Sequence, residues 1–387
     1  MKIKTIRQAK KINNQIVFLR ADFNVPMKDG KIEDDYKIVV ILPTIRFLLR
    51  HGCKIVIATH LGKPNGQDKK LSVKPIADRL SQLLDKKIKL VDKYWGRPTD
   101  ELKADLNKNN ILILENLRFC EGEKNNDKKF ARLLASMAQL YVNDAFAVSH
   151  RRHASVSAIK KYLPSYAGLL LTEEIENLNK ILKPQKPMVS VVGGDKTETK
   201  IKLVGSLSKK SFMVLVGGAL ANNFIAAHGF EVGKSFINPT YVKLAKKFKD
   251  KNIILPIDVL VGKNKEATEA QAKSISQVGK EDVILDIGPR TIKLFSDYIR
   301  KANTIVWNGP MGYSENKCFK HGTMAMAQVF ASRSRGPAFG VVGGGETVAA
   351  LNQAKMIDDI DWVSTGGGAM LAYLSGEKMP GLKGIIK

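Results

Sequence analysis

The sequence contains little cysteine, few aromatic residues and no uninterrupted apolar run of membrane-spanning length. Its three cysteines, Cys53, Cys120 and Cys318, lie far apart and form no CxxC pair. This spacing argues against a disulfide framework and against a zinc site, and it suits a reducing cytoplasm. No apolar segment follows the basic N-terminus, MKIKTIRQAKK, so we expect no signal peptide and a cytoplasmic location.

A membrane-spanning helix is not expected either. The longest stretch without a charged residue runs from Ser211 to Phe230, which is roughly the length that spans a bilayer. Gly217, Gly218 and Asn222 interrupt its apolar pattern. We therefore interpret it as a buried strand, a glycine turn and a helix.

Two common nucleotide-binding motifs are missing. No GxGxxG opens the first predicted strand–helix–strand unit, which leaves little support for a dinucleotide-dependent dehydrogenase. Residues 229–235, GFEVGKS, resemble a P-loop but have three residues between the glycines, where the motif requires four. We therefore exclude a P-loop nucleoside triphosphatase.

Positive charge, by contrast, is abundant. The chain has 63 lysine and arginine residues against 37 acidic residues, a net charge of +26 and a pI near 9.8. Such a charge attracts polyanions, so nucleic acid has to be considered. However, the lysines are spread along the whole chain, aromatic residues make up only 7%, and no RNP-like or zinc-finger motif is present. We therefore expect anionic small-molecule substrates, no specific nucleic acid and no membrane.

The 387 residues exceed the usual length of one domain, which predicts two domains. Short β-branched runs alternate with helical patterns, and these runs are apolar throughout, as in strands covered on both faces. Predicted strands lie within residues 15–20, 53–60, 110–117, 139–146, 190–194, 212–218, 252–262, 304–310 and 338–345, and predicted helices within 71–85, 126–138 and 172–182. This order predicts an α/β fold with parallel sheets in two lobes, divided near residues 180–188.

Polar and basic residues follow the predicted strands of the first half. Ligands of parallel α/β sheets bind at the carboxyl ends of the strands, so these positions form a candidate site. Arginine there can bind a carboxylate or phosphate through two parallel hydrogen bonds. The residues are Asp22 and Asn24, His60 and Lys63, Arg118, and the group His150, Arg151, Arg152 and His153. Together they predict a pocket for a small anion.

Glycines occupy the corresponding positions in the second half. They allow backbone N–H groups to approach a phosphate at a helix N-terminus, where the helix dipole favours anions. One Gly-Gly pair is a weak signal. Five such turns, at residues 193–194, 217–218, 309, 343–345 and 366–368, predict a nucleotide site.

Motifs along essentially the whole chain resemble those of phosphoglycerate kinases. In the first half they are RADFNVP (20–26), THLGKP (59–64), ENLRF (115–119) and FAVSHRRHAS (146–155). In the second half they are GGDKTETKI, VGGALANNF, LPID, WNGPMGYSE, VVGGGET and STGGGA, in the order of the family. The combination of WNGP, RxDxNVP and STGGGA is highly specific.

The resemblance implies two Rossmann-like lobes joined by a helical hinge, with the last residues returning to the first lobe. It places the phosphoglycerate-binding lobe at residues 1–170 together with 371–387, the hinge helix and linker at 171–187, and the nucleotide-binding lobe at 188–370. The family is usually monomeric.

The resemblance also implies the roles of individual residues. By motif match, the acid site would comprise Asp22, Asn24, Lys37, His60, Lys63, Arg118 and Arg151. The nucleotide would bind at Gly194, Asp195, Lys196, Lys200, Gly218, Gly288, Asn308, Glu315, Gly344, Gly345, Glu346 and Thr347. Glu315 would face the ribose, and Glu346 would be the ligand of Mg²⁺. Lys37, Lys200 and the amide of Gly345 would carry catalysis.

The implied reaction is reversible phosphoryl transfer between 1,3-bisphosphoglycerate and MgADP, giving 3-phosphoglycerate and MgATP in glycolysis and gluconeogenesis. The acceptor carboxylate is already anionic, so no general base is needed, and the lack of a Ser/His/Asp or Cys/His arrangement is expected. Catalysis would consist of positioning and charge neutralisation. Closure of the two lobes would bring the substrates together and exclude water.

Five positions depart from the family pattern. Lys37 and Lys63 stand where the family has arginine, Asp195 where it has alanine, Ala219 where it has glycine, and Glu346 where it has aspartate. Lysine keeps the charge but loses the planar fork of arginine. We interpret the chain as an active but atypical enzyme. The alternatives are a catalytically weakened relative that binds nucleotide or RNA, and a kinase of another acid on the same scaffold.

Asp195 adds a carboxylate beside the lysines of GGDKTETK. Its side chain either caps the following helix through the N–H groups of Thr197 or Glu198, or reaches the ribose or adenine. A carboxylate directed at the phosphates would be incompatible with an active kinase.

Overall fold

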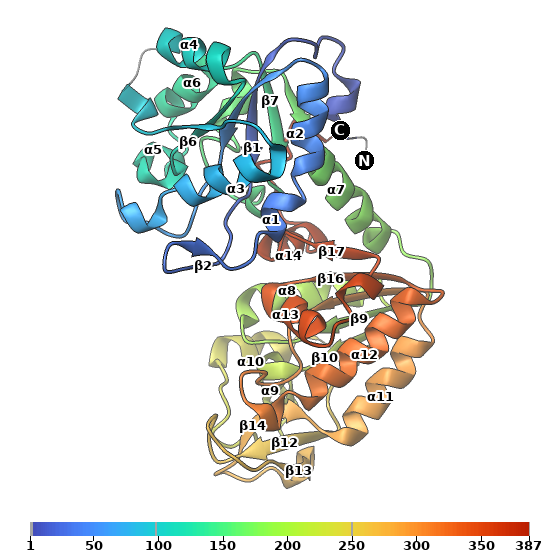
Figure 1. Cartoon of the computed structure of the whole chain (residues 1–387). Helices are drawn as coiled ribbons and strands as arrows, with labels where there is room; N and C mark the ends of the chain where they lie inside the picture. Colours follow the sequence, from blue (N-terminus) through green and yellow to red (C-terminus); the bar gives the residue numbers. More distant parts are fainter. Residues whose placement is uncertain (1–2, 97–98, 249–250, 387) are drawn as a thin grey trace. The chain divides into compact units, whose positions relative to one another are not determined.

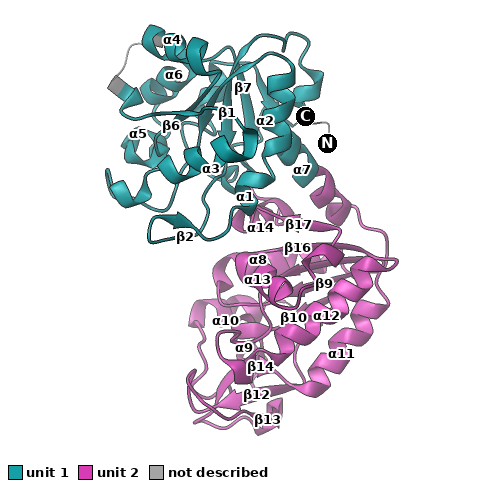
Figure 2. Ribbon diagram, in the orientation of Figure 1, with its two compact units in different colours: residues 1–175, 378–387 teal, residues 176–377 magenta. Residues whose placement is uncertain are grey.

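The computed structural model of the chain describes residues 3–96, 99–248 and 251–386. The chain divides into two compact units, residues 1–175 with 378–387 and residues 176–377 (Figure 2). The sequence placed the corresponding boundaries after residues 170 and 370. Each unit contains its own six-stranded sheet.

The first unit is built on a parallel sheet with the strand order β5-β6-β4-β1-β7-β8. β6 and β7 are buried along their whole length, which requires cover on both faces. The strands are β1 Ile16–Ala21, β4 Lys54–Ala58, β5 Lys89–Val91, β6 Ile111–Leu114, β7 Leu140–Asp144 and β8 Ser165–Ala167, with a small hairpin of β2 Met27–Lys28 and β3 Lys31–Ile32. The helices are α1 Tyr36–Val39, α2 Leu42–Arg50, α3 Lys74–Leu84, α4 Thr99–Asn109, α5 Glu121–Lys124, α6 Lys128–Ser136 and α7 Leu169–Leu182.

Local signals in the sequence set the ends of these elements. The carboxylate of Asp127 accepts a hydrogen bond from the N–H of Phe130 at 2.7 Å, so α6 begins directly after this cap. Phe130, Ala131 and Leu134 then form the buried face of the helix at helical spacing.

The C-terminal residues return to the first unit, next to the N-terminus (Figure 1). The N–H of Lys4 donates to the carbonyl oxygen of Ile385 at 2.8 Å. Lys160 Nζ donates to the carbonyl oxygens of Pro380 at 2.6 Å and Lys383 at 2.8 Å. Backbone and side-chain bonds therefore both hold this segment.

The second unit has a parallel sheet with the order β11-β10-β9-β15-β16-β17. Figure 1 shows α11 and α12 side by side along one side of it. The strands are β9 Met188–Val192, β10 Met213–Val216, β11 Ile253–Ile254, β15 Thr304–Asn308, β16 Phe339–Gly343 and β17 Trp362–Ser364. The helices are α8 Thr197–Ser208, α9 Gly218–Ala227, α10 Pro239–Ala245, α11 Pro289–Arg300, α12 His321–Arg335, α13 Gly345–Gln353 and α14 Gly368–Leu374.

One strand prediction was wrong. Residues 252–262 form two separate strands, β11 and β12 Asp258–Gly262, with Pro256 between them. Proline has no N–H to donate to a sheet ladder, so the run breaks there. β12 pairs antiparallel with β13 Gln271–Ser274 and β14 Val283–Ile287, so the second unit also carries a small antiparallel sheet that the sequence did not predict.

The α/β fold class with two lobes of parallel sheet is confirmed. The segment 211–230 is β10, a glycine turn and α9, as predicted. Among the described residues, no helix is long and apolar enough to span a bilayer.

Candidate active site

The polar residues of the first half follow four neighbouring strands. In the sheet order, β6, β4, β1 and β7 are adjacent, and all four run parallel. Their carboxyl ends therefore meet at one edge of the sheet. The sequence motifs that begin at Arg20, Thr59, Glu115 and Phe146 lie at these ends.

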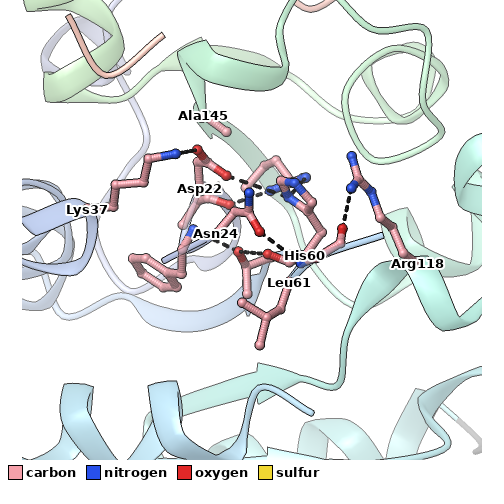
Figure 3. A network of polar contacts seen from close by, with 12 residues as sticks. Asp22, Asn24, Lys37, His60, Leu61, Arg118 and Ala145 are labelled. Carbon is pink, nitrogen blue, oxygen red and sulfur yellow. Dashed lines mark hydrogen bonds and ion pairs between the residues drawn. The ribbon is translucent and has the colours of Figure 1, made fainter. Parts of the chain in front are cut away.

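Asp22 is the centre of this edge (Figure 3). Its Oδ2 accepts a hydrogen bond from Lys37 Nζ at 2.8 Å, and its Oδ1 lies 3.6 Å from His60 Nδ1. Burial alone would raise the pKa of this carboxyl, but the charge and hydrogen bond of Lys37 and the charge of Arg20 outweigh it and lower the pKa. Asp22 is therefore ionised at neutral pH, and its Oδ1 has no hydrogen-bond partner among the described residues.

The loop after β4 is held by residues from two other strand ends. The side-chain oxygen of Asn24 accepts a hydrogen bond from the N–H of Gly62 at 2.8 Å. Arg118 donates from its guanidinium to the carbonyl oxygen of the same glycine (Figure 3). Gly62 has φ +62°, a conformation that favours glycine. The three predicted residues Asn24, His60 and Arg118 are thus brought together.

Arg20 also belongs to this site, although the sequence analysis did not name it. It is fully buried, and its guanidinium donates to Ser155 Oγ at 2.9 Å and to His60 Nδ1 at 3.3 Å. Ser155 in turn donates to the buried carboxylate of Glu123 at 2.6 Å. A charged residue inside the apolar run QIVFLR was the signal that could have identified it, because buried arginines are rare unless paired.

Positive charge is concentrated here without enough anions to balance it. Burial first, and then the charges of Arg151 and Arg20, lower the pKa of Arg118 to about 10. Burial and the arginines likewise lower the pKa of His153 to about 4. Burial also holds the pKa of His60 well below its ordinary value, so its ring is neutral. The cluster therefore carries an excess of positive charge, which favours the predicted use of this edge as a binding site for an anion.

Lys63 and Arg151 are exposed at the same end of the sheet. The charge of Arg151 acts on both Arg118 and His153, which places it beside the cluster. Lys63 follows Gly62 directly, and within the part of the chain that the structure describes no hydrogen bond or ion pair defines its position. It remains a predicted site residue.

Glycine turns bring strand ends together in the second unit. The N–H of Gly194 donates to the carbonyl oxygen of Pro310 at 2.7 Å. A Cβ on Gly218, which has φ +60°, would lie 2.4 Å from the backbone nitrogen of Gly194, and one on Gly309 would lie 2.2 Å from the carbonyl oxygen of Gly193. No side chain fits at these positions, so glycine is required for the loops after β9, β10 and β15 to touch.

Lys200 lies beneath these turns. It is 5% exposed, and its Nζ donates to the carbonyl oxygen of Gly193. Burial lowers the pKa of the ammonium to about 8, while the carboxylates of Glu346 and Asp195 act in the opposite direction. The turn therefore holds a buried cation beside two carboxylates, at the carboxyl end of β9.

Asn308 and Thr347 hold the neighbouring turns. Asn308 Nδ2 donates to the carbonyl oxygen of Gly343 at 2.7 Å, and Thr347 Oγ1 accepts from the N–H of Gly309 at 2.7 Å. Gly344 between them has φ +98°. Gly345 is exposed at the start of α13, so its amide is accessible. Asn308 and Thr347 are buried and shape these loops from within.

A cavity of about 390 Å³ opens beside the glycine turns, within the range typical of small-molecule sites. Its lining includes Gly194, Asp195 and Glu346 together with apolar side chains such as Ile225, Phe236 and Val259. Of the predicted nucleotide residues, Gly194, Asp195, Gly218, Glu315 and Glu346 line it.

The remaining predicted residues lie around this cavity. Lys196, Lys200, Asn308, Gly344, Gly345 and Thr347 are not part of its lining. Gly288 is the N-cap of α11, where its N–H donates to the carbonyl oxygen of Asp258 at 2.9 Å and a Cβ would lie 2.4 Å from the Asp258 carboxylate. Close packing therefore requires glycine at this position.

The capping hypothesis for Asp195 was wrong. The N-cap of α8 is Lys196 and has no side-chain cap bond. The carbonyl oxygen of Asp195, and not its carboxylate, accepts from the N–H of Thr197 at 2.7 Å. The side chain is exposed and lines the cavity. Its predicted contact with the ribose or adenine stays a prediction.

The segment GFEVGKS is not a phosphate loop, as the sequence indicated. The carboxylate of Glu231 accepts hydrogen bonds from the N–H groups of Val232 at 2.9 Å and Gly233 at 2.8 Å. These amides are therefore engaged with a negatively charged side chain and are not available to an anion.

Comparison with known proteins places these observations in a family. The family model described as "Phosphoglycerate kinase" matches residues 6–377. Phosphoglycerate kinases of Wolbachia sp. subsp. Drosophila simulans (strain wRi) and Wolbachia sp. subsp. Brugia malayi (strain TRS) are 42% and 41% identical to this chain over 386 and 380 residues. These alignments cover 97% and 96% of this chain and 97% and 95% of the two relatives.

Solved structures agree. The phosphoglycerate kinase of Coxiella burnetii has a TM-score of 0.86 and 36% identity, covering 99% of both chains. That of Pyrococcus horikoshii OT3 has a TM-score of 0.85 and 34% identity, covering 99% of this chain and 98% of its own. The match of sequence and fold over nearly the full length leaves one conclusion: the chain belongs to the phosphoglycerate kinase family.

Proposed function

We propose that the chain transfers a phosphoryl group reversibly between ATP and the carboxylate of 3-phosphoglycerate, with 1,3-bisphosphoglycerate and ADP as the other pair. The observation that carries the proposal is the buried ammonium of Lys200 beneath the glycine turns of β9 and β15. Burial disfavours a charged ammonium at this position, so its presence calls for a function. It can stabilise the negative charge on a phosphoryl group during transfer.

The acid site would bind the phosphoglycerate by charge. Arg20, Arg118 and Arg151 supply the positive field for its phosphate and carboxylate. Asp22 Oδ1, which has no hydrogen-bond partner within the described chain, is an acceptor for the hydroxyl of the substrate. Lys37, held by Asp22, would stabilise the transferring group.

The nucleotide would bind along the cavity, with its phosphates at the Gly194 end. Lys196, Lys200 and the amide of Gly345 would contact the phosphates, and Glu315 would face the ribose. Asp195 lines the same cavity with an exposed side chain. An active kinase requires that its carboxylate point toward the sugar or base and away from the phosphates, and we propose that it does.

Glu346 fits the role of a magnesium ligand. Within the described residues no group of three or more His, Cys, Asp or Glu side chains could hold a metal alone. Mg²⁺ in kinases is bound by one or two carboxylates together with substrate phosphates, so a single carboxylate suffices. Glu346 is exposed, and its Oε2 would lie 3.6 Å from a Cβ placed on Gly194. When bound, Mg²⁺ would neutralise negative charge on the phosphates.

The two sets of residues belong to different compact units. We propose that residues 171–187, which contain most of α7 and the linker after it, act as a hinge that lets the two bound substrates meet during turnover. The unpaired state of all three cysteines within the described chain suits the cytoplasm as the place where the enzyme works.

The alternative of a weakened relative that binds RNA receives no support from the comparisons. Isothermal titration calorimetry separates the two functions. We expect saturable binding of 3-phosphoglycerate and of MgADP, each without the other. RNA binding with a steep dependence on salt, together with no binding of MgADP, would refute the proposal.

A further inference from the structure

Ser155 links two buried charged side chains beside the acid site. Its Oγ accepts a hydrogen bond from Arg20 Nε at 2.9 Å and donates one to Glu123 Oε1 at 2.6 Å. The N–H of Ser155 also donates to Glu123 Oε2 at 2.9 Å, which holds the hydroxyl in place. None of the three residues is exposed. Any effect of this chain of hydrogen bonds on a substrate therefore has to pass through a neighbour.

That neighbour is His60. Arg20 Nη2, at the other end of the same guanidinium, lies 3.3 Å from His60 Nδ1. An arginine side chain can only donate, so Nδ1 is the acceptor of this hydrogen bond. Because the ring is neutral, it then carries its proton on Nε2. The direction of the Arg20 guanidinium thus decides which nitrogen of His60 is protonated.

Asp22 favours the opposite arrangement. Its Oδ1 lies 3.6 Å from the same His60 Nδ1 and has no hydrogen-bond partner among the described residues (Figure 3). A proton on Nδ1 would pair with this carboxylate oxygen. Such a pair would occupy the acceptor that we assign to the substrate hydroxyl, and it would remove the N–H donor from Nε2. The position of one proton therefore determines whether Asp22 and His60 are ready for the substrate.

We propose that Ser155 is a positioning residue of the acid site, which acts through Arg20 to keep the His60 proton on Nε2 and to leave Asp22 Oδ1 to the substrate. This inference rests on the proposed function. The hydroxyl is required because it both accepts from Arg20 and donates to Glu123. Without it, the buried guanidinium and carboxylate attract each other directly, which draws Arg20 away from His60.

The experiment replaces Ser155 by alanine, which removes one buried oxygen. The Kd of 3-phosphoglycerate should rise about 10-fold, as expected when a hydrogen bond to a charged group is lost, and the Kd of MgADP should stay unchanged. Two-bond ¹H–¹⁵N NMR spectra at neutral pH report the tautomer of each histidine. The His60 proton should lie on Nε2 in the wild type and shift toward Nδ1 in Ser155→Ala, with the signal assigned by its absence in His60→Gln.

Tyr141→Phe is the matched control. It also removes a buried hydroxyl that is bonded to Ser155, but Tyr141 Oη donates to the carbonyl oxygen of Ser155, at 2.8 Å, and not to its side chain. Both variants should lower the Tm. Only Ser155→Ala should change the Kd of 3-phosphoglycerate and the His60 spectrum, which a merely structural role of Ser155 would leave alone.

An unchanged Kd of 3-phosphoglycerate or an unchanged His60 spectrum in Ser155→Ala would overturn the inference, as would an equal rise of this Kd in Tyr141→Phe. If Ser155→Ala does not fold, the wild-type spectrum decides, because a proton on His60 Nδ1 contradicts the inference and one on Nε2 supports it. If the folded wild type does not bind 3-phosphoglycerate, the proposed function fails along with the inference. If it binds and the two variants behave alike, only the inference fails.

Discussion

Replacing Lys200 by methionine should remove activity and increase stability at the same time. The side chain is buried beneath the glycine turn and donates to the carbonyl oxygen of Gly193. Methionine has a similar length, fills the same space and carries no charge. The loss of activity follows from the removal of the cation. The gain in stability follows because no charged group then has to be buried at this position.

The magnitudes follow from burial and charge. The pKa of Lys200 falls from 10.5 to about 8, and at 1.36 kcal/mol per pKa unit the charged form is disfavoured in the fold by about 3 kcal/mol. Because the folded pKa is the lower one, this penalty is complete below pH 8 and disappears as the pH rises to 10.5. Loss of one group that stabilises the transition state lowers kcat by roughly 10²- to 10³-fold.

The assay combines turnover with urea unfolding at pH 7 and pH 10. The kcat of Lys200→Met should be lower than that of the wild type by that factor. The increase in its unfolding free energy over the wild type should be larger at pH 7 than at pH 10. Lys202→Met is the control, because Lys202 lies on the same helix with its side chain 61% exposed. A kcat within tenfold of the wild type, or a stability difference that does not change with pH, would refute the reasoning.

Three further predictions concern the first unit. Lys37→Arg should leave kcat equal or raise it, because a guanidinium can bond Asp22 and the transferring group at once; a loss of more than tenfold in steady-state kinetics would contradict this. Burial raises the pKa of Asp144 to about 7, while its Oδ1 accepts from the N–H of Leu171 at 2.8 Å. Its raised pKa favours folding below pH 4, and this contribution is lost as the pH rises toward 7. The unfolding free energy of Asp144→Asn relative to the wild type should therefore increase by up to about 4 kcal/mol between pH 4 and pH 7. If urea unfolding gives the same difference at both pH values, this prediction is wrong. Lys160→Met removes both side-chain hydrogen bonds to the C-terminal segment, so carboxypeptidase should digest this segment faster, with kcat measured in parallel; an unchanged rate of digestion would contradict it.

The carboxyl ends of the strands could be predicted from the sequence because parallel strands bury both faces and therefore form continuous apolar runs. The apolar runs located β1, β4, β6 and β7, and their ends then identified Asp22, His60 and Arg118 as neighbours. The glycine turns of the second half were predicted because they follow the same kind of apolar run. The close backbone contacts that a Cβ on Gly218 or Gly309 would make show why no other residue fits there.

What the sequence could not supply depends on tertiary contacts. Pro256 divides a run that reads as one strand, and the second piece pairs antiparallel with residues far along the chain. Arg20 is a site residue because Ser155 and His60 lie beside it. The position of Asp195 on the cavity lining depends on how the loop after β9 meets the neighbouring loops, which no local pattern encodes.

The most direct test of the account is a coupled assay of the purified protein with 3-phosphoglycerate and MgATP, followed by the same assay without Mg²⁺ and with Lys200→Met. The account predicts turnover by the wild type that depends on both substrates and on Mg²⁺ and is lost in the variant. No turnover by a folded wild type that binds both substrates would contradict it.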